Sequence, residues 1–407
     1  MRILRVCFVS SYPPNKGRLS EYAQNLVRAV ADRPAVDKVY VLADKVDDSQ
    51  EELKGNSKIE VLRLWKPNSP VSIIGLFWHI LRLRGDITHF NVHFQSYGKT
   101  RLANFAGFSL IPLSKIFGLK TVVLLHNLAE KVDLQKVRLK PSFVNKAGIL
   151  IATRLILTAS SVVVTVESYV HYLEARYGRK GVQYIPHGTS APHRLSTNHK
   201  EKVLLFFGHI GPSKGLPILF SAYESLLEEV EDIKLVVAGD SHPNFPYYLR
   251  EMKNVAPRGV DFVGYVREEE IAKIFSIADV VVLPYSAATG TSGVFHIACS
   301  YGKPIAATSL PEIEELVHKG ACALLVPPGN HKALKEAILR IISNKRLAAK
   351  MSEQNLVFAR KQEWPAVAEA YEKEYLRLLN LIHSDKGKNC VSVIAPSCET
   401  LHLKEFE

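Results

Sequence analysis

Short apolar runs alternate with helix-like stretches along both halves of this 407-residue chain. Such alternation is typical of parallel β-sheets whose strands are connected by helices. With 47% hydrophobic residues, the chain is long enough for two α/β domains with full cores. The sequence therefore predicts the α/β class with two doubly wound sheets. The expected strands are 2–10, 36–43, 59–64, 87–92, 121–126 and 161–166, then 202–207, 234–238, 261–263, 280–284, 304–308 and 323–326.

A polar stretch, residues 190–200, falls between the two strand-bearing halves and is the expected domain boundary. We expect an N-terminal domain over 1–192 and a C-terminal domain over 200–362. Residues 363–383, with Trp364, are expected to form one further helix. The segment 384–407 has no clear period and is expected to be a tail or a peripheral hairpin.

A glycine-rich turn, residues 208–215, follows the expected strand 202–207 and precedes an apolar helix. Glycines let a backbone approach an anion, a helix N-terminus offers unpaired N–H groups, and Lys214 adds a mobile positive charge. The turn is neither a Walker loop nor a Gly-x-Gly-x-x-Gly fingerprint. Taken alone, it is equally well interpreted as an ordinary surface turn.

A second segment rich in small residues, 283–294, also follows an apolar strand. A helix beginning near Ser292 would direct N–H groups and hydroxyls at an anion. Two anion sites at the carboxyl ends of strands in one domain favour a diphosphate ligand. The residues expected to bind it are Gly208, Lys214, Ser292, Gly293 and Val294.

Several spaced motifs give residues 2–381 a resemblance to the retaining family 4 glycosyltransferases, the glycosyl transferases group 1, which have the GT-B fold. The order and spacing of the motifs make the resemblance specific. The motifs are Ser11-Tyr12-Pro13-Pro14 with Gly17, Pro186-His187-Gly188, 208–215, Val237-Ala238-Gly239-Asp240, 262–266, 278–284, Leu310-Pro311-Glu312 and 325–330.

The resemblance implies two Rossmann-like domains that face each other across a cleft. The first would bind the acceptor and the second the nucleotide sugar, and the last helix would cross back to the first domain. The implied reaction moves a sugar from a GDP- or UDP-linked donor to a glycan or lipid-linked acceptor with retention of configuration. The family usually needs no metal for this transfer, and no Asp-x-Asp motif is present, so we expect no cofactor.

The resemblance also assigns roles to individual residues. Gly17 would approach the donor diphosphate from the first domain, and the backbone around Tyr265 and Val266 would recognise the base. His126 would face the donor sugar, although a lone histidine at a strand end is more often structural. Glu312 would either contact hydroxyls of the donor sugar or ribose, or cap the helix that follows it.

Sugar transfer leaves negative charge on the departing diphosphate, which cations and N–H groups should stabilise. Lys214 is the first candidate and His209 assists, so the predicted catalytic residues are His126, Lys214 and His209. Most of the family has Arg where this chain has His209, and a histidine is neutral or partly charged near neutral pH. The diphosphate contact at this position should therefore be weaker.

The usual pair of family glutamates is also missing, because the corresponding positions are Thr289 and Ile297. A branch of the family carries Ser-Gly-Val in place of the first motif, and Ser292-Gly293-Val294 fits that branch. The acidic contact to donor hydroxyls is therefore not expected from these two positions.

Positive charge is concentrated in the first half of the chain. Residues 1–194 carry 28 Lys and Arg against 14 Asp and Glu, whereas the remaining residues carry 24 against 26. Two apolar helix candidates, 71–84 and 102–117, and the basic segment 131–146 lie in that half. This combination suits an anionic membrane surface; the alternative, more common for a single helix, is packing against the sheet. Nucleic acid is not expected, because no recognised binding motif accompanies the charge.

No apolar run reaches the uninterrupted length of a membrane-spanning helix, since 147–166 is broken by Arg154 and two serines. The chain opens directly on a strand, so no signal peptide is expected. We expect a cytoplasmic protein, either free or peripheral on the inner face of the membrane. The five cysteines, which have no metal-like spacing, are expected to be reduced thiols.

Three interpretations of function remain open at this stage. The first is a glycosyltransferase that builds a polysaccharide or glycolipid. The second is a soluble GT-B enzyme acting on a small acceptor, such as a sugar-phosphate synthase or an epimerase. The third is a catalytically weak protein that binds sugar nucleotides, suggested by His209 and the missing glutamates.

Overall fold

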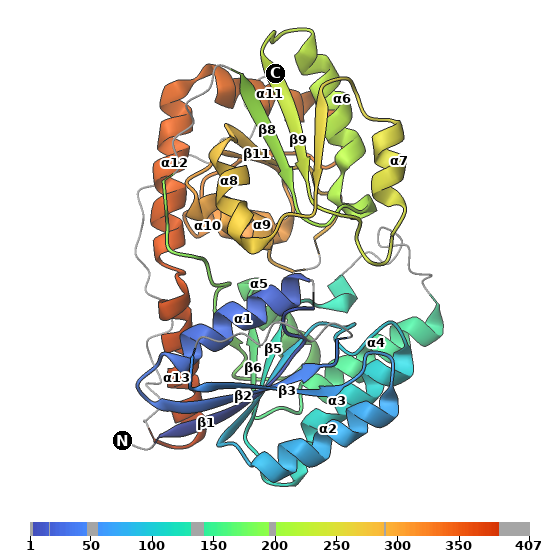
Figure 1. Ribbon diagram of the computed structural model, residues 1–407, viewed down its shortest axis with the longest axis vertical. Helices are drawn as coiled ribbons and strands as arrows, with labels where there is room; N and C mark the ends of the chain where they lie inside the picture. Colours follow the sequence, from blue (N-terminus) through green and yellow to red (C-terminus); the bar gives the residue numbers. More distant parts are fainter. Residues whose placement is uncertain are drawn as a thin grey trace.

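The computed structural model describes residues 3–15, 17–46, 56–131, 142–194, 201–288 and 290–381. Two parallel sheets, one in each half of the chain, form two lobes with helices on both faces (Figure 1). The doubly wound α/β architecture predicted from the sequence is confirmed. The predicted tail, 384–407, and the predicted boundary at 195–200 lie outside the described residues.

The first sheet has the strand order β3-β2-β1-β4-β5-β6-β7, and every pair is parallel. The order reverses between β1 and β4, the place where open α/β sheets bind ligands beyond their carboxyl ends. Strand β7 is missing from the expected ranges, because two residues are too few to show a period; only the motif Pro186-His187-Gly188, which resembles a strand end of the family, indicated it. The strands are β1 (Leu4–Val9), β2 (Val36–Asp44), β3 (Ile59–Trp65), β4 (Ile87–Val92), β5 (Thr121–Leu125), β6 (Ser161–Val164) and β7 (Gln183–Tyr184).

The helices of the first lobe cover the two faces of its sheet unequally (Figure 1). Helix α1 lies on the side nearer the second lobe, whereas α2, α3 and α4 cover the other side. The helices are α1 (Arg18–Ala31), α2 (Pro70–Leu83), α3 (Arg101–Ile116), η1 (Ala129–Lys131), α4 (Phe143–Ile156) and α5 (Glu167–Tyr177). Helices α2 and α3 confirm the two predicted apolar helices.

The second sheet has the order β10-β9-β8-β11-β12-β13 and is again parallel throughout. Its order reverses between β8 and β11. The strands are β8 (Lys202–Phe207), β9 (Ile233–Ala238), β10 (Val260–Gly264), β11 (Val280–Leu283), β12 (Ile305–Thr308) and β13 (Leu324–Val326). Around them lie η2 (Pro212–Lys214), α6 (Leu216–Leu227), α7 (Tyr248–Asn254), η3 (Glu268–Glu270), α8 (Ile271–Ser276), α9 (Gly293–Ser300), α10 (Pro311–His318), α11 (His331–Ser343) and α12 (Lys345–Arg360).

The last described helix, α13 (Trp364–Leu378), returns to the first lobe, as expected for the GT-B fold. With α12 it runs along one side of both lobes (Figure 1). Tyr371 and Tyr375 are fully buried against the first sheet, and the hydroxyl of Tyr375 is hydrogen-bonded to Nδ1 of His89 at 2.6 Å. A Cβ on Gly188 would lie 2.3 Å from the ring of Trp364, so only glycine fits where α13 begins.

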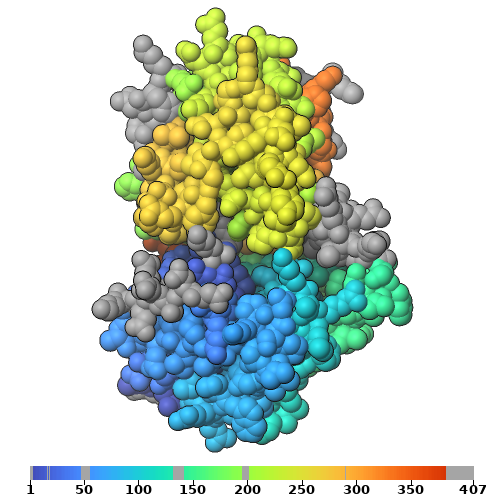
Figure 2. All heavy atoms as spheres, turned by 45° about the vertical axis from the view of Figure 1, so that its right-hand side comes forward, coloured from blue at the N-terminus to red at the C-terminus, as the bar shows by residue number. Residues whose placement is uncertain are grey.

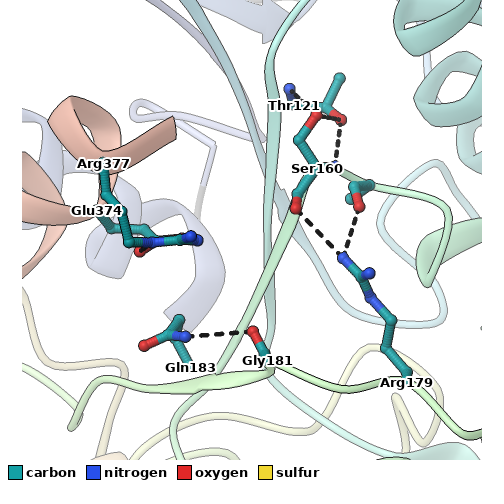
Figure 3. Close-up of polar contacts among 8 residues, drawn as sticks. Thr121, Ser160, Arg179, Gly181, Gln183, Glu374 and Arg377 are labelled. Atoms are coloured by element: carbon teal, nitrogen blue, oxygen red, sulfur yellow. Dashed lines mark hydrogen bonds and ion pairs between the residues drawn. The ribbon is translucent and has the colours of Figure 1, made fainter. Parts of the chain in front are cut away.

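Figure 3 shows polar contacts that hold the starts of β5 and β6 together in the first sheet. The amide of Ser160 donates to Oγ1 of Thr121 at 2.9 Å, and Nη2 of Arg179 donates to the carbonyl of Ser160 at 3.2 Å. Both contacts stabilise the start of β6 beside β5. In the same view Glu374 pairs with Arg377, one turn further along α13, at 2.6 Å.

Two further properties were predicted from composition. Within the described ranges, no helix has the length and apolar character needed to cross a membrane. Cys7, Cys299 and Cys322 are buried free thiols. Cys390 and Cys398 lie outside the described residues.

The attachment of α13 to the first lobe can be tested at Glu372. Its carboxylate accepts from Nε of Arg33 at 2.8 Å and from the amide of Ala35 at 3.1 Å, and the residue is 8% exposed. Glu372→Ala leaves both donors without their acceptor, so urea unfolding should show a loss of about 2–3 kcal/mol. Glu369→Ala breaks only an exposed pair with Lys373 on the same helix and should change stability little. Equal effects of the two variants would contradict this assignment.

Candidate functional site

A pocket lies where the carboxyl ends of the two sheets face each other. It combines the loop after β1 with the loops after β8, β9 and β10, and so joins both positions at which strand order reverses. Figure 2 shows the yellow and gold second lobe resting on the blue first lobe. The pocket is lined by Gly17, Glu21, Phe207, Gly208, His209, Gly239, Asp240, Tyr265 and Val266. Five of the predicted site residues are therefore brought together: Gly17, Gly208, His209, Tyr265 and Val266.

Two glycines let neighbouring loops of the second lobe touch backbone to backbone. Gly208 has a φ of 116° and Gly239 a φ of 141°, both in the region that favours glycine. A Cβ on Gly239 would lie 1.9 Å from the carbonyl oxygen of Gly208. Any side chain at position 239 would therefore push the floor of the pocket apart.

The turn that carries Lys214 is held against the segment after β11. Gly215 has a φ of 69°, and a Cβ there would lie 1.8 Å from the carbonyl oxygen of Pro284. The amide of Ser286 donates to the carbonyl of Ser213 at 2.9 Å. As a result, Nζ of Lys214 lies 3.7 Å from the centroid of the buried Tyr285 ring, in a cation–π contact. Lys214 is therefore beside the pocket lining and not part of it.

The second predicted anion site lies against the first. Ser292 caps α9, because its Oγ accepts from the amide of Phe295 at 3.3 Å. A Cβ on Gly208 would lie 3.2 Å from Cγ2 of Val294, so the first turn of α9 packs on the glycine turn. A Cβ on Gly293 would lie 3.7 Å from Nε2 of His187, a residue of the first half. The helix start thus faces both lobes, with N–H groups that have no carbonyl partner inside the helix.

His126 follows β5 and is held in one tautomer. Its Nε2 lies 2.6 Å from Oδ1 of Asn91, whose Nδ2 donates to Oγ of Ser10 at 2.9 Å. Because Oδ1 can only accept, Nε2 carries the proton and Nδ1 is the acceptor. The edge of the Tyr22 ring packs on the imidazole at 4.7 Å. Burial, and then the neighbouring histidines, lower the pKa of His126 well below its usual value, so the ring is neutral.

A loop of the second lobe touches the same histidine. A Cβ on Gly290 would lie 2.2 Å from the carbonyl oxygen of His126. The segment between β11 and α9 therefore sits directly on the end of β5. Thr289, one of the two positions where the family's glutamates are missing, lies outside the described residues.

Glu312 occupies the first turn of α10 but does not line the pocket. Its Oε1 accepts from the hydroxyl of Tyr169 at 3.0 Å, and nearby Glu315 accepts from the amides of Glu167 and Ser168 at 2.6 and 3.0 Å. The two carboxylates therefore connect α10 to the start of α5. This contact between lobes was not expected, and the donor contact predicted for Glu312 stays a prediction.

Sequence reasoning assigned no role to several residues that shape the site. Glu21 and Asp240 line the pocket, Asn91 fixes the His126 ring, and Tyr22 packs on that ring. Asn91 gave a signal, because it is a polar residue within a strand that is buried throughout. Across the described segments, no group of His, Cys, Asp or Glu is arranged to hold a metal ion. The expectation of a cofactor-free reaction stays a prediction.

Comparison with known proteins agrees with this geometry. Residues 201–344 match the family Glycosyl transferases group 1. A phosphatidyl-myo-inositol mannosyltransferase of Mycobacterium leprae is 25% identical over 188 residues, which are 46% of this chain and 50% of the relative. The chain spans about half the length of the curated relatives it matches.

Solved structures resemble nearly the whole chain. Sucrose-phosphate synthase from Thermosynechococcus elongatus has a TM-score of 0.75 at 20% identity, covering 93% of this chain and 100% of that one. Anabaena HepE, solved in complex with UDP-glucose, has a TM-score of 0.69 at 17% identity, covering 93% and 100%. The fold is therefore GT-B.

The contact between Gly290 and His126 predicts a loss of function without a loss of folding. Gly290→Ala places a methyl group on the His126 carbonyl, so the loop before α9 must move away from β5. We expect weaker binding of the ligand that spans the lobes, measured by calorimetry, with little change in melting temperature. Gly75→Ala is the control, because nothing lies within 4 Å of that Cβ. Unchanged binding in Gly290→Ala would show that the loop position is unimportant.

Proposed function

We propose that the protein is a hexosyltransferase that moves a sugar from a nucleotide-diphosphate sugar, as a retaining family 4 glycosyltransferase of the Ser-Gly-Val branch. The observation that carries the proposal is the pocket in which Gly17 of one lobe meets the Gly208 turn of the other. The group 1 match over the second lobe and the mannosyltransferase relative support it. HepE, a structural neighbour, binds UDP-glucose, which favours a sugar nucleotide as donor.

The departing diphosphate requires positive charge and N–H donors in a fixed arrangement. Lys214 supplies the permanent charge, and its position on the Tyr285 ring keeps the ammonium beside the pocket. The amides of Gly293 and Val294, at the start of α9, supply donors. Gly17 brings the first lobe to the same group, because it lines the pocket opposite Gly208.

The nucleoside occupies the part of the pocket formed after β9 and β10. Tyr265, Val266, Gly239 and Asp240 line it. His126 faces the donor sugar in this arrangement. Its neutral imidazole with a fixed tautomer offers Nδ1 as a hydrogen-bond acceptor, so we assign it to sugar positioning and not to proton donation near neutral pH.

The acceptor is proposed to be lipid-linked, within polysaccharide or glycolipid synthesis, because the first lobe exposes an apolar face. Trp78 of α2 is 71% exposed, Ile116 of α3 76% and Phe143 of α4 85%. The light-blue and cyan residues of α2 and α3 form the lower front surface in Figure 2. Exposed apolar residues of the three helices are Val71, Ile74, Trp78, Leu102, Phe105, Leu113, Ile116, Phe143, Val144 and Ile151.

Cations accompany this apolar face. Arg82 and Arg84 end α2, Lys115 ends α3, and Lys146 lies in the first turns of α4. Exposed apolar patches rimmed by charge mark binding surfaces, and basic ones suit anionic lipids. The predicted basic residues Lys136, Arg138 and Lys140 lie outside the described residues. We propose that the protein docks on the cytoplasmic face of an anionic membrane through α2, α3 and α4.

Nucleotide binding tests the donor site directly. One nucleoside diphosphate among GDP, UDP and ADP should stabilise the protein by about 2–3 kcal/mol at a hundredfold excess over its Kd. In Lys214→Ala this gain should shrink, and release of the nucleoside diphosphate from the matching sugar nucleotide should fall on the order of a hundredfold. Lys253→Ala, which removes an exposed lysine from the Phe262 ring of the same lobe, is the control.

No stabilisation by any nucleotide would reject the donor site. Binding without transfer in the wild-type protein would favour the catalytically weak binding protein. Transfer to a small sugar phosphate, without any need for a membrane, would favour the soluble GT-B enzyme. Full turnover by Lys214→Ala would remove Lys214 from the mechanism.

Membrane docking predicts that two exposed aromatic residues matter together. The double variant Trp78→Ser, Phe143→Ser should bind vesicles containing phosphatidylglycerol at least about tenfold more weakly in a sedimentation assay. Its matched control is Tyr247→Ser, Val255→Ser, which removes two residues of similar exposure from the second lobe. Wild-type binding should also weaken with salt and on neutral phosphatidylcholine. Equal binding by both double variants would reject this surface.

A further inference from the structure

His242, in the loop after β9, lies two residues after the pocket-lining Asp240 and has no role in the predictions above. Its ring centroid is 6.0 Å from that of His209, and the two rings meet edge to face at 76°. A Cβ on Gly211 would lie 3.3 Å from the Cβ of His242, so the loop packs on the glycine turn itself. The charge of Lys214 also acts on His242. His242 therefore belongs to the same group of basic side chains as Lys214 and His209.

The backbone fixes the tautomer of His242. The amide of Asn244 donates to Nδ1 at 3.1 Å, so Nδ1 accepts and Nε2 carries the proton of the neutral ring. Nε2 is consequently an N–H donor in both the neutral and the charged form. An anion could therefore bind His242 without a change of tautomer.

The same loop also touches the first lobe. Nδ2 of Asn244 donates to Oε1 of Gln95 at 3.2 Å. The amide of Gln95 in turn donates to Nδ1 of His93 at 2.9 Å, so His93 also carries its proton on Nε2. Burial, and then the repulsion from a charged His242, lower the pKa of His93, which follows β4 at the strand reversal of the first sheet. Two histidines, one from each lobe, thus flank the cleft with the same tautomer.

The charged and titratable groups around His242 are mostly basic. They are Lys214 on η2, His209 after β8 and His93 after β4, with Asp240 two residues earlier and Glu21 on α1 as pocket-lining carboxylates. Asp240 is exposed, and its Oδ1 accepts from the amide of Ser241. Imidazoles packed this closely resist protonation unless an anion joins them. The group formed by Lys214, His209, His93 and His242 therefore has the composition of an anion-binding site whose histidines take up protons when the anion binds.

We propose that His242 is a further donor-binding residue that contacts the diphosphate and, with His209, replaces the guanidinium that position 209 lacks. This inference rests on the proposed function, because the anion is the diphosphate of the nucleotide sugar. The two imidazoles then make the diphosphate contacts that one arginine would otherwise make. Donor affinity becomes dependent on pH, which a guanidinium would not allow.

The direction of the pH effect follows from linkage. In the unliganded protein, burial and then Lys214 lower the pKa of His242 below its usual value, so the ring is neutral at pH 7 to 8. A bound diphosphate favours the charged ring and raises that pKa. Charging also places a proton on Nδ1, so the amide of Asn244 loses its acceptor, which makes the rise smaller. Affinity is therefore constant at high pH and increases as the pH falls through the pKa of the complex.

The test compares wild type with His242→Asn. Asparagine keeps an acceptor near Nδ1 for the amide of Asn244 but removes the distal N–H. Calorimetry at about pH 6 and about pH 8 should use the stabilising nucleoside diphosphate, its parent nucleoside and the corresponding sugar nucleotide. The sugar nucleotide is included because its phosphates, unlike a terminal phosphate, do not titrate in this range.

We expect His242→Asn to weaken binding of the sugar nucleotide on the order of tenfold at the lower pH, the usual contribution of a charge-assisted hydrogen bond. The effect should be smaller at the higher pH, and nucleoside affinity should not change. His79→Asn, at an exposed histidine of α2, is the control. Adding His209→Arg to His242→Asn should restore affinity and remove its dependence on pH.

Equal affinity of wild type and His242→Asn for the sugar nucleotide at the lower pH would overturn the inference and leave the proposed function intact. A parallel loss of nucleoside binding would also overturn it, because His242 would then only support the loop. If the wild-type protein binds none of the nucleoside diphosphates, the proposed function fails and this inference fails with it.

Discussion

The packing of α13 on the first sheet is the contact on which the cleft depends. Each sheet alone presents only half of a site at the place where its strand order reverses. Buried Tyr371 and Tyr375 join the last helix to the core of the first lobe. The ring of Trp364 packs so closely on Gly188 that no side chain would fit at position 188. Because the helix before it, α12, belongs to the second lobe, this packing brings the Gly17 loop opposite the Gly208 turn.

The chemistry of the pocket follows from how little positive charge its described residues carry. Lys214 packs on the ring of Tyr285 beside the lining, and the other basic groups described there include histidines that follow strands of both lobes. Burial keeps His126 and His93 neutral, so they act as oriented dipoles more than as charges. A diphosphate would change this balance, because a bound anion favours the protonated form of nearby imidazoles. Arginine at position 209 would have made the site insensitive to such a change.

The fold could be predicted largely because buried parallel strands appear in the sequence as nearly continuous apolar runs. Strands β4 and β8 have the expected bounds, whereas β7 is too short to show a pattern. The glycine-rich turn after β8 could also be predicted, because Gly208 has a positive φ, a conformation that favours glycine. Sequence could not show that Glu312 bonds Tyr169, or that Asn244 bonds Gln95, because those residues meet only when the lobes do. Nor could it decide which side of α2 and α3 faces solvent, where the structure exposes Trp78 and Ile116.

Hydrogen–deuterium exchange with and without the stabilising nucleoside diphosphate tests most directly the claim that one ligand is held by both lobes. The account predicts slower exchange in peptides that contain Gly17 and in peptides that contain Gly208 and His242, with little change in α2 or α11. Protection confined to the second lobe would contradict it, because the nucleotide would then bind one Rossmann-like domain without the cleft.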